Sequence, residues 1–147
     1  MRRIAIIIIS ILGLISTDVL SKNYISSITT GNYVSLFGEY IGLQLSYNPG
    51  IAFSLPITGL PLQIITALLV VGLIIYYIKE EYKKNSYLID IWYAFILAWA
   101  ISHGYERIFI WYVIDFISIK YFAILNFADI FISIGACLIF FLYYVRK

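Results

Sequence analysis

The sequence predicts an all-α membrane protein with four transmembrane helices and a small β element on the membrane surface. Of its 147 residues, 63% are hydrophobic and only 12% are charged, a composition outside the range of soluble domains. Apolar runs long enough to cross a bilayer recur along the chain, and short polar segments separate them. The length is that of a single domain, which we expect to be an integral membrane unit covering residues 1–147.

Four apolar runs define the predicted spans, at about residues 4–20, 57–78, 87–107 and 124–145. The first run follows Arg2 and Arg3 and could be a secretory signal peptide. We expect it to be retained, because no small-residue cleavage pattern follows it. Pro61 falls in the first turn of the second span, a position where a helix tolerates proline.

A period of two in the segment between the first two spans predicts strands. Apolar side chains alternate with small or polar ones over residues 41–47, so a hairpin is expected at about residues 33–47. An open sheet edge cannot face hydrocarbon, which places this hairpin at the membrane surface. The aromatic-rich residues 108–123 suit an interfacial belt and are too few for another pair of spans.

The basic residues predict the orientation of the chain. Positive charge gathers on the cytoplasmic side of membrane proteins. Seven of the ten lysines and arginines fall on one side of the predicted spans, and these are Arg2, Arg3, Lys79, Lys83, Lys84, Arg146 and Lys147. Both termini are therefore expected in the cytoplasm, with the hairpin near the outer face.

Residues 113–129 are almost wholly apolar, yet they contain Asp115, Asn126 and Asp129. Ionised carboxylates in an apolar setting are costly and persist where they are paired or used. Two carboxyl groups brought together hold one proton between them, which is the arrangement of an aspartic peptidase. The alternative is two unrelated polar residues at a membrane surface. Asp18 and Lys22, four residues apart, would pair at the end of the first helix.

Metal, cofactor and nucleic-acid functions are not predicted. The chain has one histidine and one cysteine, too few for an ordinary protein zinc site. Its net charge of +2 is small, and the basic residues form no stripe that would bind nucleic acid.

The chain resembles the bacterial lipoprotein signal peptidases (signal peptidase II) over nearly its whole length. Asp18 and Lys22 match the family's Asp-x-x-x-Lys, and residues 48–54 match its Asn-x-Gly-x-Ala-Phe-Ser box. Residues 113–116 match Val-x-Asp-Phe, and residues 126–129 match Asn-x-Ala-Asp. Arg107 matches the arginine that ends the third span, eight residues before Asp115.

This resemblance implies an aspartic endopeptidase of the bacterial cytoplasmic membrane that needs no cofactor. It would cut prolipoproteins just before a cysteine that already carries diacylglyceryl, near the outer face of the membrane and in contact with membrane lipid. Its implied catalytic dyad is Asp115 and Asp129. The residues implied to position substrate and dyad are Asn48, Gly50, His103, Arg107 and Asn126, and those implied to support the site are Asp18, Lys22 and Glu106.

One box departs from the family pattern. The third span of the family usually ends Gly-Asn-x-x-Asp-Arg, whereas residues 102–107 read Ser-His-Gly-Tyr-Glu-Arg. His103 replaces the asparagine, Glu106 replaces the aspartate, and Trp111 stands where glycine is common. This departure leaves open a catalytically inactive binder of lipidated peptides. A small proton-coupled carrier is a second alternative, because acids within the membrane also mark proton relays. The sequence predicts no oligomeric state.

Overall fold

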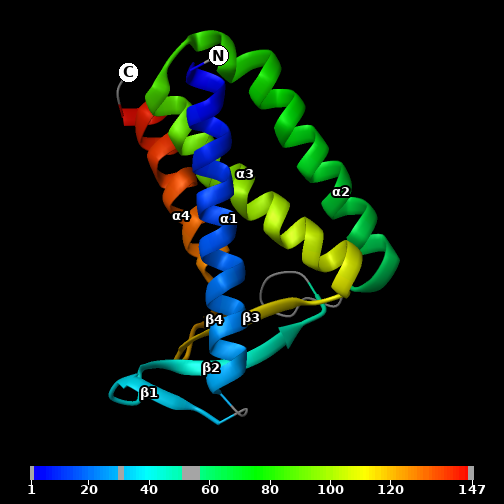
Figure 1. Cartoon of the computed structure of the whole chain (residues 1–147), viewed down its shortest axis with the longest axis vertical. Helices are drawn as coiled ribbons and strands as arrows, with labels where there is room; N and C mark the ends of the chain where they lie inside the picture. Colours follow the sequence, from blue (N-terminus) through cyan, green and yellow to red (C-terminus); the bar gives the residue numbers. More distant parts are fainter. Residues whose placement is uncertain (1, 30–31, 51–56, 146–147) are drawn as a thin grey trace.

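A computed structural model describes residues 2–29, 32–50 and 57–145 and shows four helices standing on a small sheet (Figure 1). The helices are α1 (Arg2–Ile28), α2 (Gly59–Tyr76), α3 (Tyr87–Tyr105) and α4 (Phe127–Phe140). Within the described residues, three helical segments are long and apolar enough to cross a membrane, at Arg2–Ile28, Gly59–Lys84 and Phe127–Tyr144. The remaining helix, α3, contacts each of the other three and carries many buried side chains. The predicted helical membrane fold is confirmed.

α1, α2 and α3 run past the predicted ends of their apolar runs, whereas α4 begins later than predicted, at Phe127, because residues 123–125 form a strand. α1 continues to Ile28, past the predicted end at residue 20. α2 continues through the π-helical segment η2 (Tyr77–Glu81) and the 3-10 segment η3 (Tyr82–Lys84). α3 and α4 continue into the π-helical segments η4 (Glu106–Ile110) and η5 (Phe141–Val145). Hydropathy locates the part of each helix that meets hydrocarbon, whereas the helix itself ends where its backbone hydrogen bonds do.

The β element is a four-stranded antiparallel sheet in the order β1-β2-β3-β4. The predicted hairpin is confirmed as β1 (Val34–Phe37) and β2 (Ile41–Asn48). A second pair of strands was not predicted, since residues 108–123, expected to suit an interfacial belt, also form β3 (Val113–Ile119) and begin β4 (Ala123–Leu125). β3 pairs along β2 and so satisfies the backbone N–H and C=O groups of an edge that would otherwise be open.

The register of β2 and β3 determines which of their side chains meet at the site. Ser46 lies opposite Asp115, and Asn48 lies opposite Val113. The end of β2 therefore brings Asn48 next to Asp115, although 67 residues separate them in the chain. Asp129 arrives from the first turn of α4, which follows β4 directly.

The end of the bundle opposite the sheet is fastened by buried polar contacts (Figure 1). Asp90, near the start of α3, is 1% exposed and accepts hydrogen bonds from Arg3 (2.5 and 2.7 Å) and from Tyr77 (2.7 Å). Nearby, Glu81 binds Lys84 (2.8 Å) and Tyr143 (2.6 Å). A buried acid requires such partners, so these contacts join α1, α2, α3 and η5 at one end.

α3 and α4 approach each other closely at Gly135. A Cβ atom there would lie 2.9 Å from Ile96 Cγ1 and 3.0 Å from the carbonyl oxygen of Trp92. Only glycine allows this packing, which holds α4 against α3. α2 instead leans away from α4 at the sheet end of the bundle (Figure 1), and a cavity lies between them.

Candidate active site

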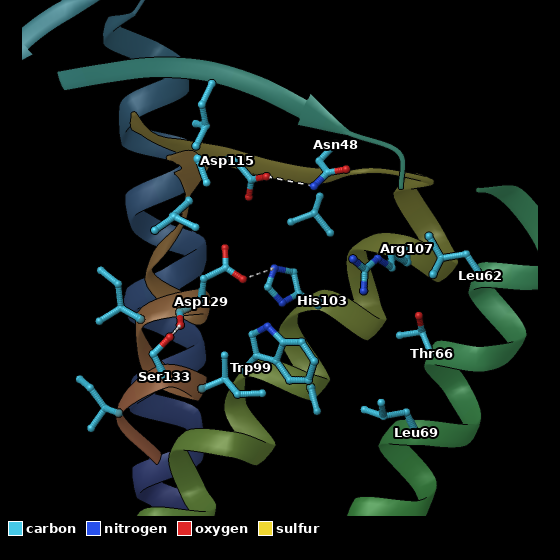
Figure 2. A pocket seen from close by; sticks show the side chains of 18 of the residues that line it. Asn48, Leu62, Thr66, Leu69, Trp99, His103, Arg107, Asp115, Asp129 and Ser133 are labelled. Carbon is cyan, nitrogen blue, oxygen red and sulfur yellow. Dashed lines mark hydrogen bonds and ion pairs between the residues drawn. The ribbon is translucent and has the colours of Figure 1, made fainter. Parts of the chain in front are cut away.

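The cavity, of about 550 Å³, lies among α2, α3, α4 and the ends of β3 and β4. Its walls are mainly apolar, and Figure 2 shows the polar side chains that converge at its sheet end. These polar side chains are Asn48, His103, Arg107, Asp115 and Asp129. The residues that the sequence singled out from four distant segments thus line one cavity.

The two aspartates come from different elements. Asp115 belongs to β3 and is 4% exposed, whereas the side chain of Asp129, in the first turn of α4, is 29% exposed. One carboxylate oxygen of each and one ring nitrogen of His103 all lie within 4.8 Å of one another. The predicted dyad is therefore brought together, with a histidine beside it.

Asn126 fixes both aspartates at once. It is fully buried, and its side-chain amide donates to Asp115 Oδ1 (2.6 Å). Its backbone N–H donates to Asp129 Oδ2 (3.1 Å), and its side-chain oxygen accepts from the backbone N–H of Asp129 (3.1 Å). This reciprocal pattern is a capping box, which satisfies free N–H groups at the start of α4. The geometry of the dyad is thus built into a helix start.

Asn48, Gly50 and Arg107 form the rim of the site. The amide of Asn48 donates to Asp115 Oδ2 over 3.4 Å, and its oxygen accepts from the N–H of Gly50 (3.0 Å). Arg107 donates to the carbonyl oxygen of Gly50 (3.2 Å). The rest of the predicted box, residues 51–54, lies outside the described residues. The described part links the end of β2 to the end of α3.

His103 lies beside Asn126 and Asp129. Its Nε2 is 3.1 Å from the Asn126 amide nitrogen and 3.7 Å from Asp129 Oδ1. Trp99 meets the imidazole edge-on, with ring centroids 5.4 Å apart, and donates a hydrogen bond to Asp129. Sequence reasoning missed Trp99. Its position four residues before His103, on the same face of α3, was the available signal.

A buried polar cluster supports the site from behind. Lys22 pairs with Asp18 (2.6 Å) and with Glu106 (2.7 Å), and Ser102 donates to Asp18 (2.5 Å). The predicted pairing of Asp18 with Lys22 is confirmed, but the pair lies inside the bundle and not at a helix end, because α1 continues to Ile28, Asp18 is fully buried and Lys22 is 3% exposed. The sequence also missed the part that Ser102 plays in this cluster.

The same cluster holds the backbone beside each aspartate. Asp18 Oδ1 accepts from the N–H of Ala128 (3.1 Å), and Glu106 Oε1 accepts from the N–H of Ile114 (3.4 Å). Ala128 precedes Asp129 and Ile114 precedes Asp115. One cluster between α1 and α3 therefore anchors the backbone beside both aspartates.

The environment of Asp115 favours its protonated form. Burial, and secondarily the nearby charge of Asp129, raise the pKa of Asp115 to about 7, against the opposing hydrogen bond from Asn126. Carboxyl groups this close titrate as a pair. The raised pKa of Asp115 therefore favours one proton shared by the two carboxyl groups near neutral pH.

A helical membrane protein with such a dyad at the end of an apolar cavity is a membrane-embedded aspartic endopeptidase. The family model described as "Signal peptidase (SPase) II" matches residues 9–145. The chain belongs to the signal peptidase II family, and it is a bacterial inner-membrane protein.

Individual relatives agree with this assignment. A lipoprotein signal peptidase of Fusobacterium nucleatum is 34% identical over 116 residues, which are 78% of this chain and 70% of the relative. One from Clostridium novyi is 28% identical over 140 residues, covering 90% of this chain and 93% of the relative.

The fold also matches two solved structures of bacterial membrane enzymes. One has a TM-score of 0.80 at 22% identity and covers 95% of this chain and 87% of its own. The other has a TM-score of 0.82 at 21% identity and covers 98% and 96%.

Proposed function

We propose that this protein, acting as a single domain over residues 1–147, removes the signal peptide from prolipoproteins by cutting just before a cysteine that carries diacylglyceryl. The observation that carries the proposal is the pair of aspartates at the end of a cavity of about 550 Å³ with mainly apolar walls. Such a cavity suits an apolar peptide and acyl chains, and its few polar groups would orient the scissile bond.

The proposed reaction is direct attack by water. Asp129, more exposed and at the N-terminus of α4, is the ionised base, since a helix N-terminus stabilises an anion. Asp115, the more buried carboxyl group, carries the shared proton. Asp129 takes a proton from water as the hydroxide oxygen bonds to the carbonyl carbon, and Asp115 donates its proton to the carbonyl oxygen.

Collapse of the tetrahedral intermediate completes the cycle. The carbon–nitrogen bond breaks, Asp129 gives its proton to the leaving amine of the cysteine, and Asp115 recovers its proton from the hydroxyl group of the intermediate. Both carboxyl groups thereby return to their starting states, and no acyl-enzyme forms.

The neighbouring residues have positioning roles in this proposal. Asn126 aligns both carboxylates, and Asn48 with Gly50 and Arg107 forms the rim where the peptide backbone would lie. His103 lies against Asn126 and Asp129. The buried cluster of Asp18, Lys22 and Glu106 keeps the two segments in place.

The charge pattern supports an orientation. Both ends of the described chain lie together at the end of the bundle away from the sheet, where Arg3 and Lys84 also lie (Figure 1). The positive-inside rule favours the cytoplasm for this end. The dyad would then act near the outer face of the membrane.

Cleavage by the purified protein in detergent tests the proposal. A prolipoprotein with diacylglyceryl on its lipobox cysteine should yield a product whose mass begins at that cysteine, whereas the unmodified precursor should be cut far more slowly. Equal cutting of both precursors would refute the substrate. Binding of the lipidated peptide without any cleavage would identify an inactive binder instead.

A further inference from the structure

His103 adds a nitrogen ligand to the two carboxylates. One of its ring nitrogens and one oxygen each of Asp115 and Asp129 lie within 4.8 Å of one another, and His103 Nε2 is 3.7 Å from Asp129 Oδ1. Ligand atoms at roughly 2.0–2.2 Å from one tetrahedral zinc ion lie about 3.4 Å apart. Closing the three groups by up to about 1.4 Å would therefore bring them into contact with one ion.

The hydrogen bonds of the site leave one oxygen of each carboxylate without a close hydrogen-bond partner. Asp115 is held through Oδ1 at 2.6 Å, and its Oδ2 has only the long 3.4 Å contact with Asn48. Asp129 is held through Oδ2 by Asn126, and its Oδ1 points to His103 (Figure 2). Asp115 Oδ2 and Asp129 Oδ1 are thus available to a ligand without breaking the capping box.

The ring nitrogens of His103 are not fully satisfied by hydrogen bonds. The side chain of His103 is 4% exposed and lines the cavity, and its Nε2, the nitrogen nearest Asp129, shares the Asn126 amide with Asp115 Oδ1 and the carbonyl oxygen of Ile114. Among the described residues its Nδ1 has no hydrogen-bond partner. Buried polar atoms without a partner are rare and call for an explanation. Histidine is the commonest protein ligand of transition metals, and the asparagine usual in this family lacks its nitrogen lone pair.

The donor set selects the kind of ion. One imidazole nitrogen with two carboxylates is the mixed set that zinc accepts, with three protein ligands and an open position facing the cavity. Magnesium and calcium prefer oxygen ligands alone. The expectation of no metal site came from counting histidine and cysteine, and it left out two carboxylates that only the fold brings to the histidine.

We propose that His103, Asp115 and Asp129 bind a zinc ion that reversibly blocks the peptidase. An ion bound to both carboxylates occupies the oxygen that must accept the proton of water and the oxygen that must carry the shared proton. Zinc would thus compete with the shared proton for the two carboxylates. The inhibition rests on the proposed function, whereas the binding does not.

Direct binding is the first arm of the test. The intact protein in detergent is stripped with EDTA, desalted and titrated with Zn²⁺ by calorimetry. We expect one ion per chain and at least about tenfold weaker binding in His103→Asn and in Asp129→Asn, since even loss of a residue outside the ligand set costs roughly 10–100-fold. Glu39→Gln, which removes an exposed acid of the β1–β2 turn, should bind as the wild type does.

Inhibition is the second arm. Each variant is compared with its own EDTA-treated rate, so a lower basal rate of His103→Asn does not matter. Zinc should inhibit the wild type, EDTA should restore its rate, and His103→Asn should need at least about tenfold more zinc. Equal zinc affinity in wild type and His103→Asn would overturn the proposal, as would the absence of binding. Zinc binding without peptidase activity would instead refute the proposed function.

Discussion

At the scale of single residues, the site depends most on Asn126. The side chain of Asn126 is fully buried and donates a hydrogen bond from its amide to Asp115. The backbone N–H of Asn126 donates a hydrogen bond to Asp129. It also caps α4, so the start of a helix and the spacing of a catalytic pair are one structural feature. Asn126 therefore has two roles, since it caps the helix and also holds the two carboxylates in place.

The pH dependence of cleavage tests the shared proton. The reaction needs Asp115 protonated, and its pKa is raised to about 7, so the rate should fall as pH rises through that value. Asn48→Leu removes a hydrogen bond that lowers the pKa of Asp115, so the alkaline limb should move to higher pH.

The measurement is the initial cleavage rate against pH in one detergent with EDTA in every buffer. Glu39→Gln is the control and should leave the profile in place, since Glu39 lies in the β1–β2 turn and pairs with Lys120. A wild-type rate that stays flat well above pH 8 would show that no proton of this kind is used.

At the scale of elements, the buried ion pairs between α1 and α3 hold the bundle to the sheet. Lys22, 3% exposed, lies between Asp18 and Glu106, and both acids accept hydrogen bonds from backbone N–H groups beside Asp129 and Asp115. Removing one partner of a buried pair costs about 3–5 kcal/mol, because the other charge is left uncompensated.

We therefore expect Lys22→Met to lower the melting temperature in detergent clearly and to reduce turnover. The matched control is Lys120→Met, which breaks a surface pair with Glu39 of equal length, 2.6 Å, and an exposed pair contributes only about 0–1 kcal/mol. Equal melting temperatures for the two variants would mean that the cluster does not stabilise the bundle.

The elements also show what a sequence can and cannot predict. Long apolar runs are a local property, so the helices were predictable to within their ends. β3 was not, because its partner β2 lies about 70 residues earlier and its aromatic flanks resemble an interfacial belt. The dyad was predictable because two aspartates stand out in an apolar stretch. The contacts of Trp99 and Ser102 were not, since they arise only where α3 meets α4 and α1.

At the scale of the whole molecule, two polar ends enclose an apolar bundle. The sheet end holds the dyad, and the other end holds the contacts of Asp90 and Glu81 (Figure 1). If the second end is cytoplasmic, the site acts at the outer face. This arrangement suits a substrate whose signal peptide already lies in the membrane.

Cysteine labelling in intact cells tests that orientation. In a Cys137→Ser background, an impermeant thiol reagent should label Ser35→Cys in β1 from outside. It should label Lys83→Cys, at the opposite end, only after lysis. Both introduced sites are exposed, so accessibility within the protein does not bias the comparison. The reverse pattern would place the dyad on the cytoplasmic side.

The most direct test of the central claim is the cleavage rate of Asp115→Asn, Asp129→Asn and the double variant on a diacylglyceryl prolipoprotein. Each single change removes one member of an acid–base pair, so each should lose at least about 10²–10⁴-fold in rate. The double variant should lose little more, because residues that act as one unit are not additive. Near-normal cleavage by either single variant, with the protein still folded in detergent, would contradict the aspartic dyad.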